Sequence, residues 1–344
     1  MKPIVAIPMG DAAGIGPEII VKALTDAMVQ EKARCIIVGE KNVLQQALDF
    51  CNIKLKINVV TNPGEGKYEP DILNLIDLKN ISMVQLKIGE VQGMTGQAAY
   101  EYISKATQLC LEKKADVLAT TPINKESLKV AKVPYIGHTE IIGAITKTDN
   151  PLTMFQVHNL RVFFFSRHVS LKDACDQVKQ DNLAAFIDQC VDALEILGIK
   201  NPHIAIAGLN PHSGEHGLFG REEVDEVMPA VEAARARGID IDGPIGADSV
   251  FHFALKGAYD AVLSLYHDQG HIATKMVDFE KTISLTIGMP ILRTSVDHGT
   301  ALDIAGKGIA SPVSMIEAIR LAVEYAPNFN RKNSKKNGRM QNLG

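Results

Sequence analysis

The stretch AVLSLYHDQGH, residues 261–271, begins as an apolar run and changes abruptly to polar and ionisable side chains. The stretches RVFFFSRH, residues 161–168, and HIAIAGLNPHSGEHG, residues 203–217, have the same form. Short apolar runs bounded by turn residues are typical of buried strands. Each of the three predicted strands is followed closely by a histidine: His168, His212 and His267.

Apolar runs of this kind recur along the chain and alternate with helical patterns. The predicted strands lie within residues 3–9, 34–40, 115–122, 161–166, 203–209 and 260–266. Apolar residues three and four positions apart predict helices over residues 95–114, with Thr95 as the N-cap, and over residues 170–198. This alternation predicts an α/β fold with a mostly parallel sheet that helices cover on both faces.

The chain of 344 residues is long enough for two domains, each with its own core. Changes in composition place the domain junctions near residues 130 and 290. We therefore expect residues 1–130 plus 290–327 to form one α/β domain and residues 131–289 the other. The tail, residues 328–344, is basic and rich in Asn, which predicts disorder; an RNA or membrane contact is the alternative.

Composition limits the classes of function. A net charge of −4 gives no reason to expect a nucleic-acid partner, and no apolar run approaches the roughly 20 residues that cross a bilayer. The first apolar run is too short for a signal peptide. The five scattered cysteines favour reduced thiols, so we expect a cytoplasmic protein.

The three histidines suggest a metal site. Ligands of open α/β sheets bind beyond the carboxyl ends of the strands, so the three side chains could face one edge of the sheet. Three imidazoles with an open position suit a catalytic divalent ion such as Zn²⁺ or Mn²⁺. The alternative is that each histidine only caps a strand end or contacts water, and spacing alone leaves both interpretations open.

Glycine-rich segments mark both ends of the chain. In MGDAAGIGPEII, residues 9–20, a strand leads through a glycine turn to a helix that begins at Pro17, beside Glu18. The turn is either a phosphate-binding loop or a plain tight turn, because it is not GxGxxG and no Walker lysine follows. In TSVDHGTALDIAGKGIASP, residues 294–312, glycines and small residues would let a flat or phosphorylated ligand approach the backbone closely.

Both segments carry a resemblance to known enzymes. Residues 294–312 are similar to the nucleotide-binding segment of isopropylmalate and isocitrate dehydrogenases, and GDAAGIGPE resembles their GDGIGPE turn. Five further motifs resemble the 4-hydroxythreonine-4-phosphate dehydrogenase family, in order and over residues 3 to about 325. They are GHTE (137–140), LNPHSGE (209–215), GADSVF (246–251), YHDQG (266–270) and RTSVDHGTALD (293–303).

The resemblance implies an isopropylmalate-dehydrogenase-like fold of two α/β/α domains with the active site in the interdomain cleft. It further implies a homodimer whose subunits share the active site, with NAD and one divalent metal ion (Zn, Mn, Co or Mg) as cofactors. The implied metal ligands are His168, His212 and His267, and the implied substrate contacts are His138, Thr139, Lys275 and Arg293. The expected NAD contacts are Asp297, His298, Gly299, Asp303 and Lys307, although Asp303 and Lys307 could equally be surface charges.

One segment departs from the biosynthetic branch of this family, which typically reads Gly-Arg-Gly-Val-Asn. Here the run is EKTIS, residues 280–284, so that Ser284 replaces a substrate-contacting Asn and Lys281 replaces an Arg. The chain resembles more closely the paralogous branch that acts on 4-phospho-D-threonate and 4-phospho-D-erythronate. The implied reaction is NAD-dependent oxidation and decarboxylation to dihydroxyacetone phosphate and CO₂. The alternative is the 4-hydroxy-L-threonine 4-phosphate dehydrogenase reaction of pyridoxal phosphate (vitamin B6) biosynthesis.

The general base is assigned to Asp248, with Lys275 as the second candidate. Asp248 could equally cap the helix expected to start at Ser249.

Two other classes of function stay open. A phosphate acyltransferase of similar fold should not need three histidines at one sheet edge. A non-catalytic binding protein should show no NAD turnover.

Overall fold

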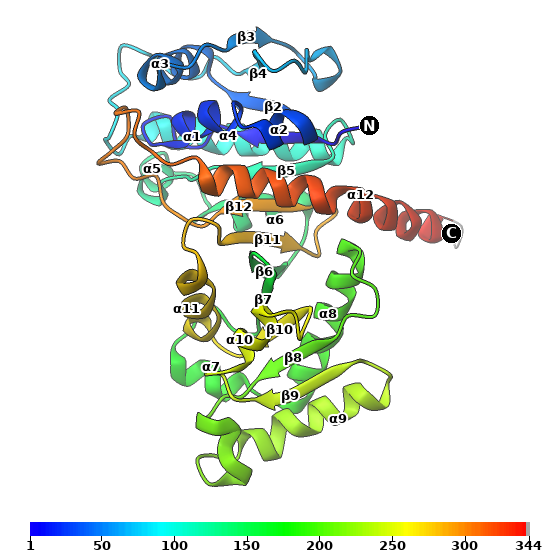
Figure 1. Cartoon of the computed structure of the whole chain (residues 1–344). Coiled ribbons are helices and arrows are strands. Elements are labelled where there is room, and N and C mark those ends of the chain that lie inside the picture. Colours follow the sequence, from blue (N-terminus) through cyan, green and yellow to red (C-terminus); the bar gives the residue numbers. More distant parts are fainter. Residues whose placement is uncertain (342–344) are drawn as a thin grey trace. The chain divides into compact units, whose positions relative to one another are not determined.

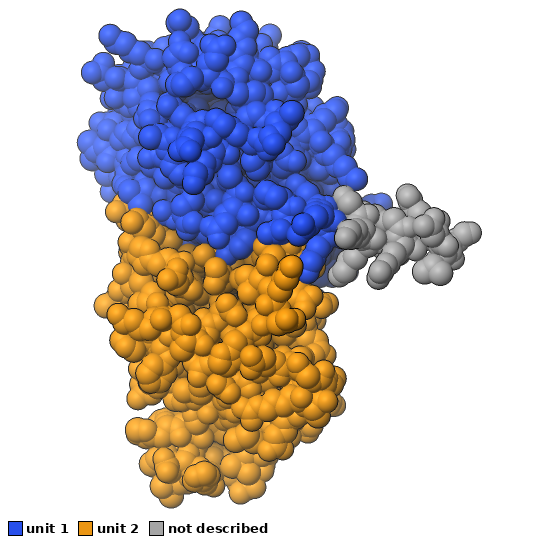
Figure 2. All heavy atoms as spheres, turned by 45° about the vertical axis from the view of Figure 1, so that its right-hand side comes forward, with its two compact units in different colours: residues 1–151, 283–344 blue, residues 152–282 orange. Residues whose placement is uncertain are grey.

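The structure is a computed structural model that describes residues 1–341, with side chains described to residue 332. The chain divides into two compact units, which Figure 2 colours separately: unit 1 is Met1–Pro151 with Ile283–Gly344, and unit 2 is Leu152–Thr282. The divisions differ from the expected junctions at 130 and 290. The reason is that helix α6 (His138–Thr146) packs on helix α4 (Gly93–Leu111) of unit 1, and residues 283–287 pair within the sheet of unit 1.

The sheet of unit 1 contains all three strands predicted within residues 1–130 (Figure 1). Its order is β3 (Lys56–Val59), β4 (Ile72–Asp77), β2 (Arg34–Gly39), β1 (Ile4–Pro8), β5 (Val117–Thr120), β12 (Arg293–Val296) and β11 (Ile283–Ile287). Neighbouring strands are parallel except β11, which is antiparallel to β12.

Helices of unit 1 pack against this sheet. Besides α4 and α6 they are α1 (Gly16–Ala23), α2 (Ala27–Lys32), α3 (Lys41–Cys51), α5 (Lys125–Val130), α12 (Val313–Gln341) and the short 3₁₀ helix Pro63–Glu65. Helix α4 contacts β1, β2 and β5, and α12 contacts β12, β5 and β11. Helix α4 begins at Gly93, so Thr95 lies inside it rather than at the N-cap, with its hydroxyl donating to the carbonyl of Gln92.

The C-terminal segment differs from its expected form. Residues 328–341 are the last part of helix α12, and residues 342–344 of the predicted tail lie outside the described residues. The helix continues because Phe329 is buried, and because the Asn330 side chain donates to the carbonyl of Asp116 in unit 1. The tail is rich in charged and polar residues, and the sequence pattern gave no sign of these two contacts.

The sheet of unit 2 has the order β6 (Leu152–Val157), β7 (Leu160–Phe164), β10 (Ala261–Ser264), β8 (Ile204–Ala207) and β9 (Ile241–Ile245). The hairpin β6–β7 is antiparallel and the other pairs are parallel. The mostly parallel α/β fold predicted from the sequence is therefore confirmed, and each predicted apolar run contains a strand.

Helices of unit 2 connect these strands. They are α7 (Leu171–Gln177), α8 (Gln180–Leu197), α9 (Met228–Ala236), α10 (Val250–Leu255) and α11 (His267–Val277), with a 3₁₀ segment Pro211–Gly217 and a π-helical segment Glu223–Val227. The single helix expected over residues 170–198 is two helices, and the Ser170 hydroxyl caps the first by accepting from the backbone of Asp173.

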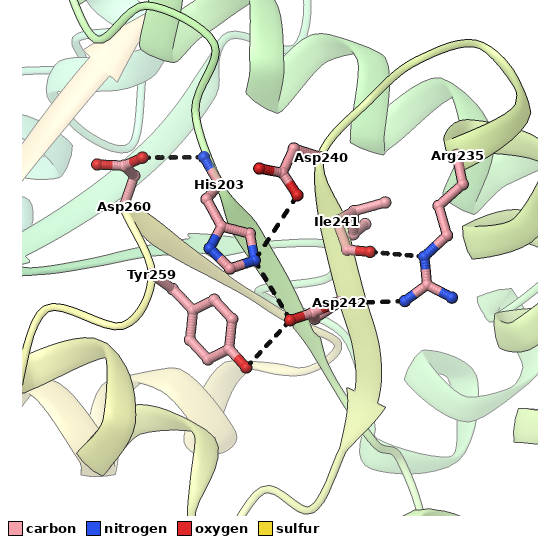
Figure 3. A network of polar contacts seen from close by, with 7 residues as sticks. All are labelled: His203, Arg235, Asp240, Ile241, Asp242, Tyr259 and Asp260. Atoms are coloured by element: carbon pink, nitrogen blue, oxygen red, sulfur yellow. Dashed lines mark hydrogen bonds and ion pairs between the residues drawn. The ribbon is translucent and has the colours of Figure 1, made fainter.

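The amino ends of β8, β9 and β10 are joined by a polar network (Figure 3). Nε2 of His203 lies 3.2 Å from Oδ2 of Asp242, which also accepts from the hydroxyl of Tyr259. The backbone N–H of His203 donates to Asp260, and Arg235 contacts the second oxygen of Asp242 at 3.4 Å. These contacts join the three strands at their amino ends. His168, His212 and His267 lie beyond the opposite, carboxyl ends of strands in this sheet.

Within the described residues, no helix is long and apolar enough to cross a membrane.

Candidate active site

The three histidines that follow strands lie at one edge of the unit 2 sheet. Strands β7, β10 and β8 are adjacent and parallel, so their carboxyl ends meet at the same edge. His168 follows β7, His212 follows β8, and His267 is the first residue of α11 after β10. The rings of His168 and His267 have centroids 6.0 Å apart. The predicted placement is therefore found, and two of the three imidazoles are neighbours.

A pocket of about 310 Å³ lies beside these two imidazoles. Its lining includes Ser166, Arg167, His168, Tyr266 and His267, all from the segments that follow β7 and β10. A cavity of this size at the carboxyl ends of parallel strands is where α/β proteins bind small ligands.

His212 does not join the other two. Every residue from His212 to Gly217 has positive φ, with His212 at φ 53°. Such left-handed conformations cost roughly 1–2 kcal/mol for each residue with a side chain. Within the described residues, no three His, Cys, Asp or Glu side chains are grouped so as to hold a metal ion. The structure thus gathers two predicted ligands and leaves the third exposed on its loop.

The loop of His212 is anchored at its start. Asn210 donates from its backbone N–H and from Nδ2 to the carboxylate of Glu223, at 2.7 and 2.8 Å. Glu223 is itself buried at the start of the π-helical segment. This anchor fixes where the loop begins, and His212 beyond it is exposed.

The donor chemistry of His267 fits a metal ligand. Its Nδ1 lies 2.7 Å from Oδ1 of Asp268. An ionised carboxylate only accepts hydrogen bonds, so this contact assigns the ring proton to Nδ1 and leaves the lone pair of Nε2 available. Imidazoles that bind metal usually donate their other N–H in this way. The chemistry of His267 therefore fits a metal ligand, with the ring of His168 beside it, and His212 is not grouped with them among the described residues.

Helix α11 contributes a residue that the sequence analysis missed. His271 lies one helical turn after His267, and the two rings stack with centroids 3.9 Å apart. Burial lowers the pKa of His271 to about 3. The signal in the sequence is the four-residue spacing in HDQGH, which puts both imidazoles on one face of a helix.

Gln269 was also missed. Its side-chain oxygen accepts from the backbone N–H of Leu265 at 2.7 Å, and its amide donates to the carbonyl of Gly208 at 2.8 Å. Leu265 follows β10 and Gly208 follows β8, and the side chain of Gln269 is buried. Gln269 therefore joins the two strand ends from which His267 and His212 extend.

The two candidate bases have different surroundings. Asp248 is exposed and does not line the pocket, and helix α10 has Ser249 rather than Asp248 at its N-cap. Lys275 lies two turns after His267 on α11, with Nζ 5.4 Å from the ring centroid of Phe279, and its charge acts on His271. Lys275 is thus in electrostatic reach of the imidazoles, while the described contacts give Asp248 no such link.

In unit 1, the predicted substrate residues Ser284 and Arg293 share a sheet face. Strands β11 and β12 pair Ser284 with Ser295 and Thr286 with Arg293, and residues directly opposite or two apart point to the same side. The guanidinium of Arg293 donates to the hydroxyls of Thr120 at 3.0 Å and Thr286 at 3.1 Å.

Arg293 is a buried cation that forms no ion pair among the described side chains, although the charge of Glu140 acts on it at longer range. Only 5% of it is exposed. Burial lowers its pKa to about 10, so the side chain is still charged at neutral pH. Because a buried charge is costly unless it is paired, this site is suited to an anionic ligand.

His138 lies close to Arg293 at the start of α6. Its Nε2 is buried without a hydrogen-bond partner among the described side chains. Burial and then the charge of Arg293 lower the pKa of His138 well below its ordinary value, so that the ring is neutral at pH 7. Thr139 follows it on the helix. A neutral imidazole with an unused polar atom, near the guanidinium of Arg293, can bind a polar group of the same anionic ligand.

The glycine turn near the N-terminus is a tight turn and not a phosphate loop. The backbone N–H groups of Asp11, Gly14 and Ile15 donate to carbonyls of the protein, and that of Ala13 donates to the Asp11 carboxylate. A Cβ on Gly10 would lie 2.4 Å from the carbonyl oxygen of Pro122. The glycine is thus required by close backbone packing, and these N–H groups are occupied.

This turn and helix α1 hold the candidate NAD segment. Ile15 donates to the carbonyl of Thr300 at 3.0 Å, and the buried carboxylate of Glu18 accepts from the backbone N–H of Gly306. A Cβ on Gly14 would lie 2.8 Å from Cβ of Thr300. The two glycine-rich motifs at opposite ends of the sequence are therefore in direct contact.

The predicted NAD contacts lie on the outer side of this segment. Gly299, Asp303 and Lys307 are exposed, whereas Asp297 and His298 are partly buried. A Cβ on Gly299 would meet nothing within 4 Å, so the backbone there is open to a ligand. This exposure fits a nucleotide laid along residues 297–307.

Comparison with known proteins now identifies the family. Residues 31–322 match the family model described as "Pyridoxal phosphate biosynthetic protein PdxA". The chain belongs to the PdxA family. The resemblance that the motifs indicated is thereby confirmed.

Individual members of the PdxA family match over almost the whole chain. A relative from Clostridium botulinum is 59% identical over 330 residues, 96% of this chain and 99% of its own, and one from Fusobacterium nucleatum is 58% identical over 329 residues, again 96% and 99%. Both carry the provisional name D-threonate 4-phosphate dehydrogenase. The crystal structure of 4-hydroxythreonine-4-phosphate dehydrogenase from Klebsiella pneumoniae has a TM-score of 0.87 and 39% identity, covering 95% of this chain and 98% of its own. The PdxA relatives are thus named as dehydrogenases of two phosphorylated substrates.

Proposed function

We propose that the chain is an NAD-dependent and divalent-metal-dependent dehydrogenase of 4-phospho-D-threonate or 4-phospho-D-erythronate. The C3 hydroxyl is oxidised with transfer of a hydride to NAD⁺ and release of a proton. The resulting 3-keto acid then loses its carboxylate as CO₂, and the enolate that this leaves takes up a proton at C2 to give dihydroxyacetone phosphate. The names of the Clostridium and Fusobacterium relatives support this substrate class.

The observation that carries the proposal is the buried guanidinium of Arg293. It donates to the hydroxyls of Thr120 and Thr286 and forms no ion pair among the described side chains, so it can take a phosphate or carboxylate without giving up a direct contact with a carboxylate. His138 would accept a hydrogen bond from a substrate hydroxyl at its unpartnered Nε2, because its other ring nitrogen donates to the backbone of Thr121, and Thr139 would add its hydroxyl. Ser284 lies two positions from Thr286 on the same face, where its short side chain would contact the substrate near C2.

The divalent ion would be held by His168 and His267, with His212 completing the set. Bound there, it would lower the pKa of the substrate hydroxyl and stabilise the negative charge that develops on the oxygen. The proton of that hydroxyl would pass to Lys275 or Asp248. Lys275 is favoured by its position on the same helix face as His267 and His271.

The NAD would lie along residues 297–307. Asp303 would accept hydrogen bonds from a ribose and Lys307 would contact a phosphate, while Asp297, His298 and Gly299 would line the nicotinamide side. The exposure of Gly299, Asp303 and Lys307 on a segment that α1 holds in place supports this assignment. A homodimer with a shared active site, in the cytoplasm, completes the proposal.

The decisive experiment measures NADH formation by metal-loaded protein with two substrates side by side. A higher kcat/KM for 4-phospho-D-threonate than for 4-hydroxy-L-threonine 4-phosphate supports the proposal. The opposite preference would favour the pyridoxal phosphate branch, for which the Klebsiella structure is the specific support. No NADH with either substrate would refute both.

A further inference from the structure

The imidazole of His267 is held from two directions. Along the ring edge, Nδ1 contacts the carboxylate of Asp268 at 2.7 Å. Across the ring face, the imidazole of His271 stacks at a centroid distance of 3.9 Å and an interplanar angle of 25°. The first contact fixes the tautomer, and the second restricts rotation of the ring about its bond to the main chain.

His271 can restrict its neighbour because it is itself fixed. Its ring lies 4.4 Å, centroid to centroid, from the rings of both Phe155 on β6 and Phe164 on β7. The ring of Phe155 meets it edge-on, at 82°, while that of Phe164 is tilted by 33°. Aromatic contacts of this kind stabilise the position of the ring beyond what the burial of its area provides.

Gly270 makes this arrangement possible. A Cβ at residue 270 would lie 2.6 Å from Cε1 of Phe164 and 2.8 Å from Oγ of Ser264. Helix α11 therefore approaches β7 and β10 closely only because residue 270 has no side chain. This close approach brings residue 271 between the two phenylalanines and its ring against His267.

We propose that His271 and Asp268 are positioning residues for His267, and that they set the affinity of the histidine site for a divalent ion. The inference rests on the metal ion of the proposed function. Neither residue needs to touch the ion: His271 acts through the orientation of the His267 ring, and Asp268 through its tautomer. Partners of this kind typically change metal affinity by about 10–100-fold when they are removed.

The test compares His271→Leu with His271→Phe in the full chain. Both substitutions place an apolar side chain between Phe155 and Phe164, but only phenylalanine retains a ring that can stack on His267. We expect His271→Leu to weaken Co²⁺ affinity about 10–100-fold, and His271→Phe to keep it within about threefold of wild type. Affinity is measured by competition with a chromophoric chelator, and the ligand-field absorption of bound Co²⁺ reports the geometry.

Asp268→Asn tests the second contact, because the amide is isosteric but lacks the charge that favours a proton on Nδ1. We expect about tenfold weaker Co²⁺ binding. The matched control is His252→Leu, an exposed histidine of α10 whose ring is likewise next to a phenylalanine, Phe253. Thermal unfolding of every variant identifies any that fail to fold.

The outcomes separate the inference from the proposed function. Wild-type protein that binds Co²⁺, with His271→Leu and His271→Phe both unchanged, would overturn the stacking role while leaving the metal site standing. Equal losses in both variants would also overturn it, since the ring would then not be the cause. A wild-type chain that binds no divalent ion would overturn the metal site and the inference together.

Discussion

Lys22 of helix α1 donates from Nζ to the carbonyl oxygen of Ala310 at 2.6 Å and to that of Gly308 at 2.9 Å, although nearly the whole chain separates them in sequence. Together with Glu18, which accepts from Gly306, it fixes the end of the glycine-rich segment. The first helix of the chain therefore shapes the surface on which we place NAD.

Replacing Lys22 with Met should weaken NAD binding more than it changes turnover. Two charge-assisted hydrogen bonds are lost, each worth about 1.5–3 kcal/mol, and the segment that they order becomes looser. We expect KM for NAD to rise about tenfold, with kcat and KM for the phosphorylated substrate nearly unchanged. Steady-state kinetics with each substrate varied in turn measures this.

Lys32→Met is the control, because Lys32 ends α2 and makes no described contact with residues 297–310. A Lys22→Met variant whose KM for NAD equals that of the Lys32→Met variant would contradict the assignment of residues 297–307 as the NAD segment.

Removing His212 should release the metal although its ring is exposed in this structure. We expect His212→Ala and His168→Ala each to lose bound metal and activity together, by about 100-fold or more in affinity. His216→Ala is the matched control, since His216 lies on the same left-handed loop. Elemental analysis after dialysis is the measurement. Normal metal content in His212→Ala would reduce the site to His168 and His267.

Arg293→Lys should keep a positive charge yet impair substrate binding. Lysine cannot reproduce the planar fork that contacts Thr120 and Thr286 while leaving donors for an anion. We expect kcat/KM for the phosphorylated substrate to fall about tenfold or more, with KM for NAD unchanged. The control is Arg320→Lys on α12, where the side chain already pairs with Glu317 and Glu324. Equal kinetics for the two variants would argue against an anion site at Arg293.

Much of the fold could be predicted because buried strands appear in the sequence as short runs of apolar residues. Residues 203–209 and 260–266 contain little but apolar side chains, and they form buried strands β8 and β10. Strand β3, Lys56–Val59, shows no such run, because it is an edge strand with half of its surface in solvent. Likewise, residues 328–341 are rich in charge, so the sequence pattern did not reveal that Phe329 is buried and that α12 continues through this segment.

The positions of site residues that directly follow strands could be predicted from the sequence. The positions that depend on tertiary packing could not. His168 and His267 follow adjacent strands, so the rule for parallel sheets brought them together. The role of His271 depends on Phe155, more than 100 residues earlier, which no local pattern reveals. The left-handed path of the His212 loop is also set by tertiary contacts, such as that of Asn210 with Glu223.

Asp11→Asn should stabilise unit 1, and more so at higher pH. The Asp11 side chain is fully buried, and burial raises its pKa above the ordinary value. A carboxyl whose pKa is raised in the folded state contributes stability below its unfolded pKa and loses it as the pH rises through the folded value. Asn avoids this loss while its oxygen can still accept from the backbone of Ala13. Thermal unfolding should show a larger advantage of the variant at pH 8 than at pH 5; an advantage that shrinks with pH would contradict the raised pKa.

Ser284→Asn should shift substrate choice toward the amino substrate. Ser284 lies on the same face as Arg293, so a longer side chain there extends over the ligand that the guanidinium binds. The amide adds a second donor and an acceptor, and an acceptor can bind the amino group at C2 of 4-hydroxy-L-threonine 4-phosphate. We expect the ratio of kcat/KM for this substrate over 4-phospho-D-threonate to rise about tenfold. Ser284→Ala is the control, because it removes the hydroxyl without adding the amide. If both variants change the ratio equally, residue 284 does not select between a hydroxyl and an amine, and selection must come from other residues around C2.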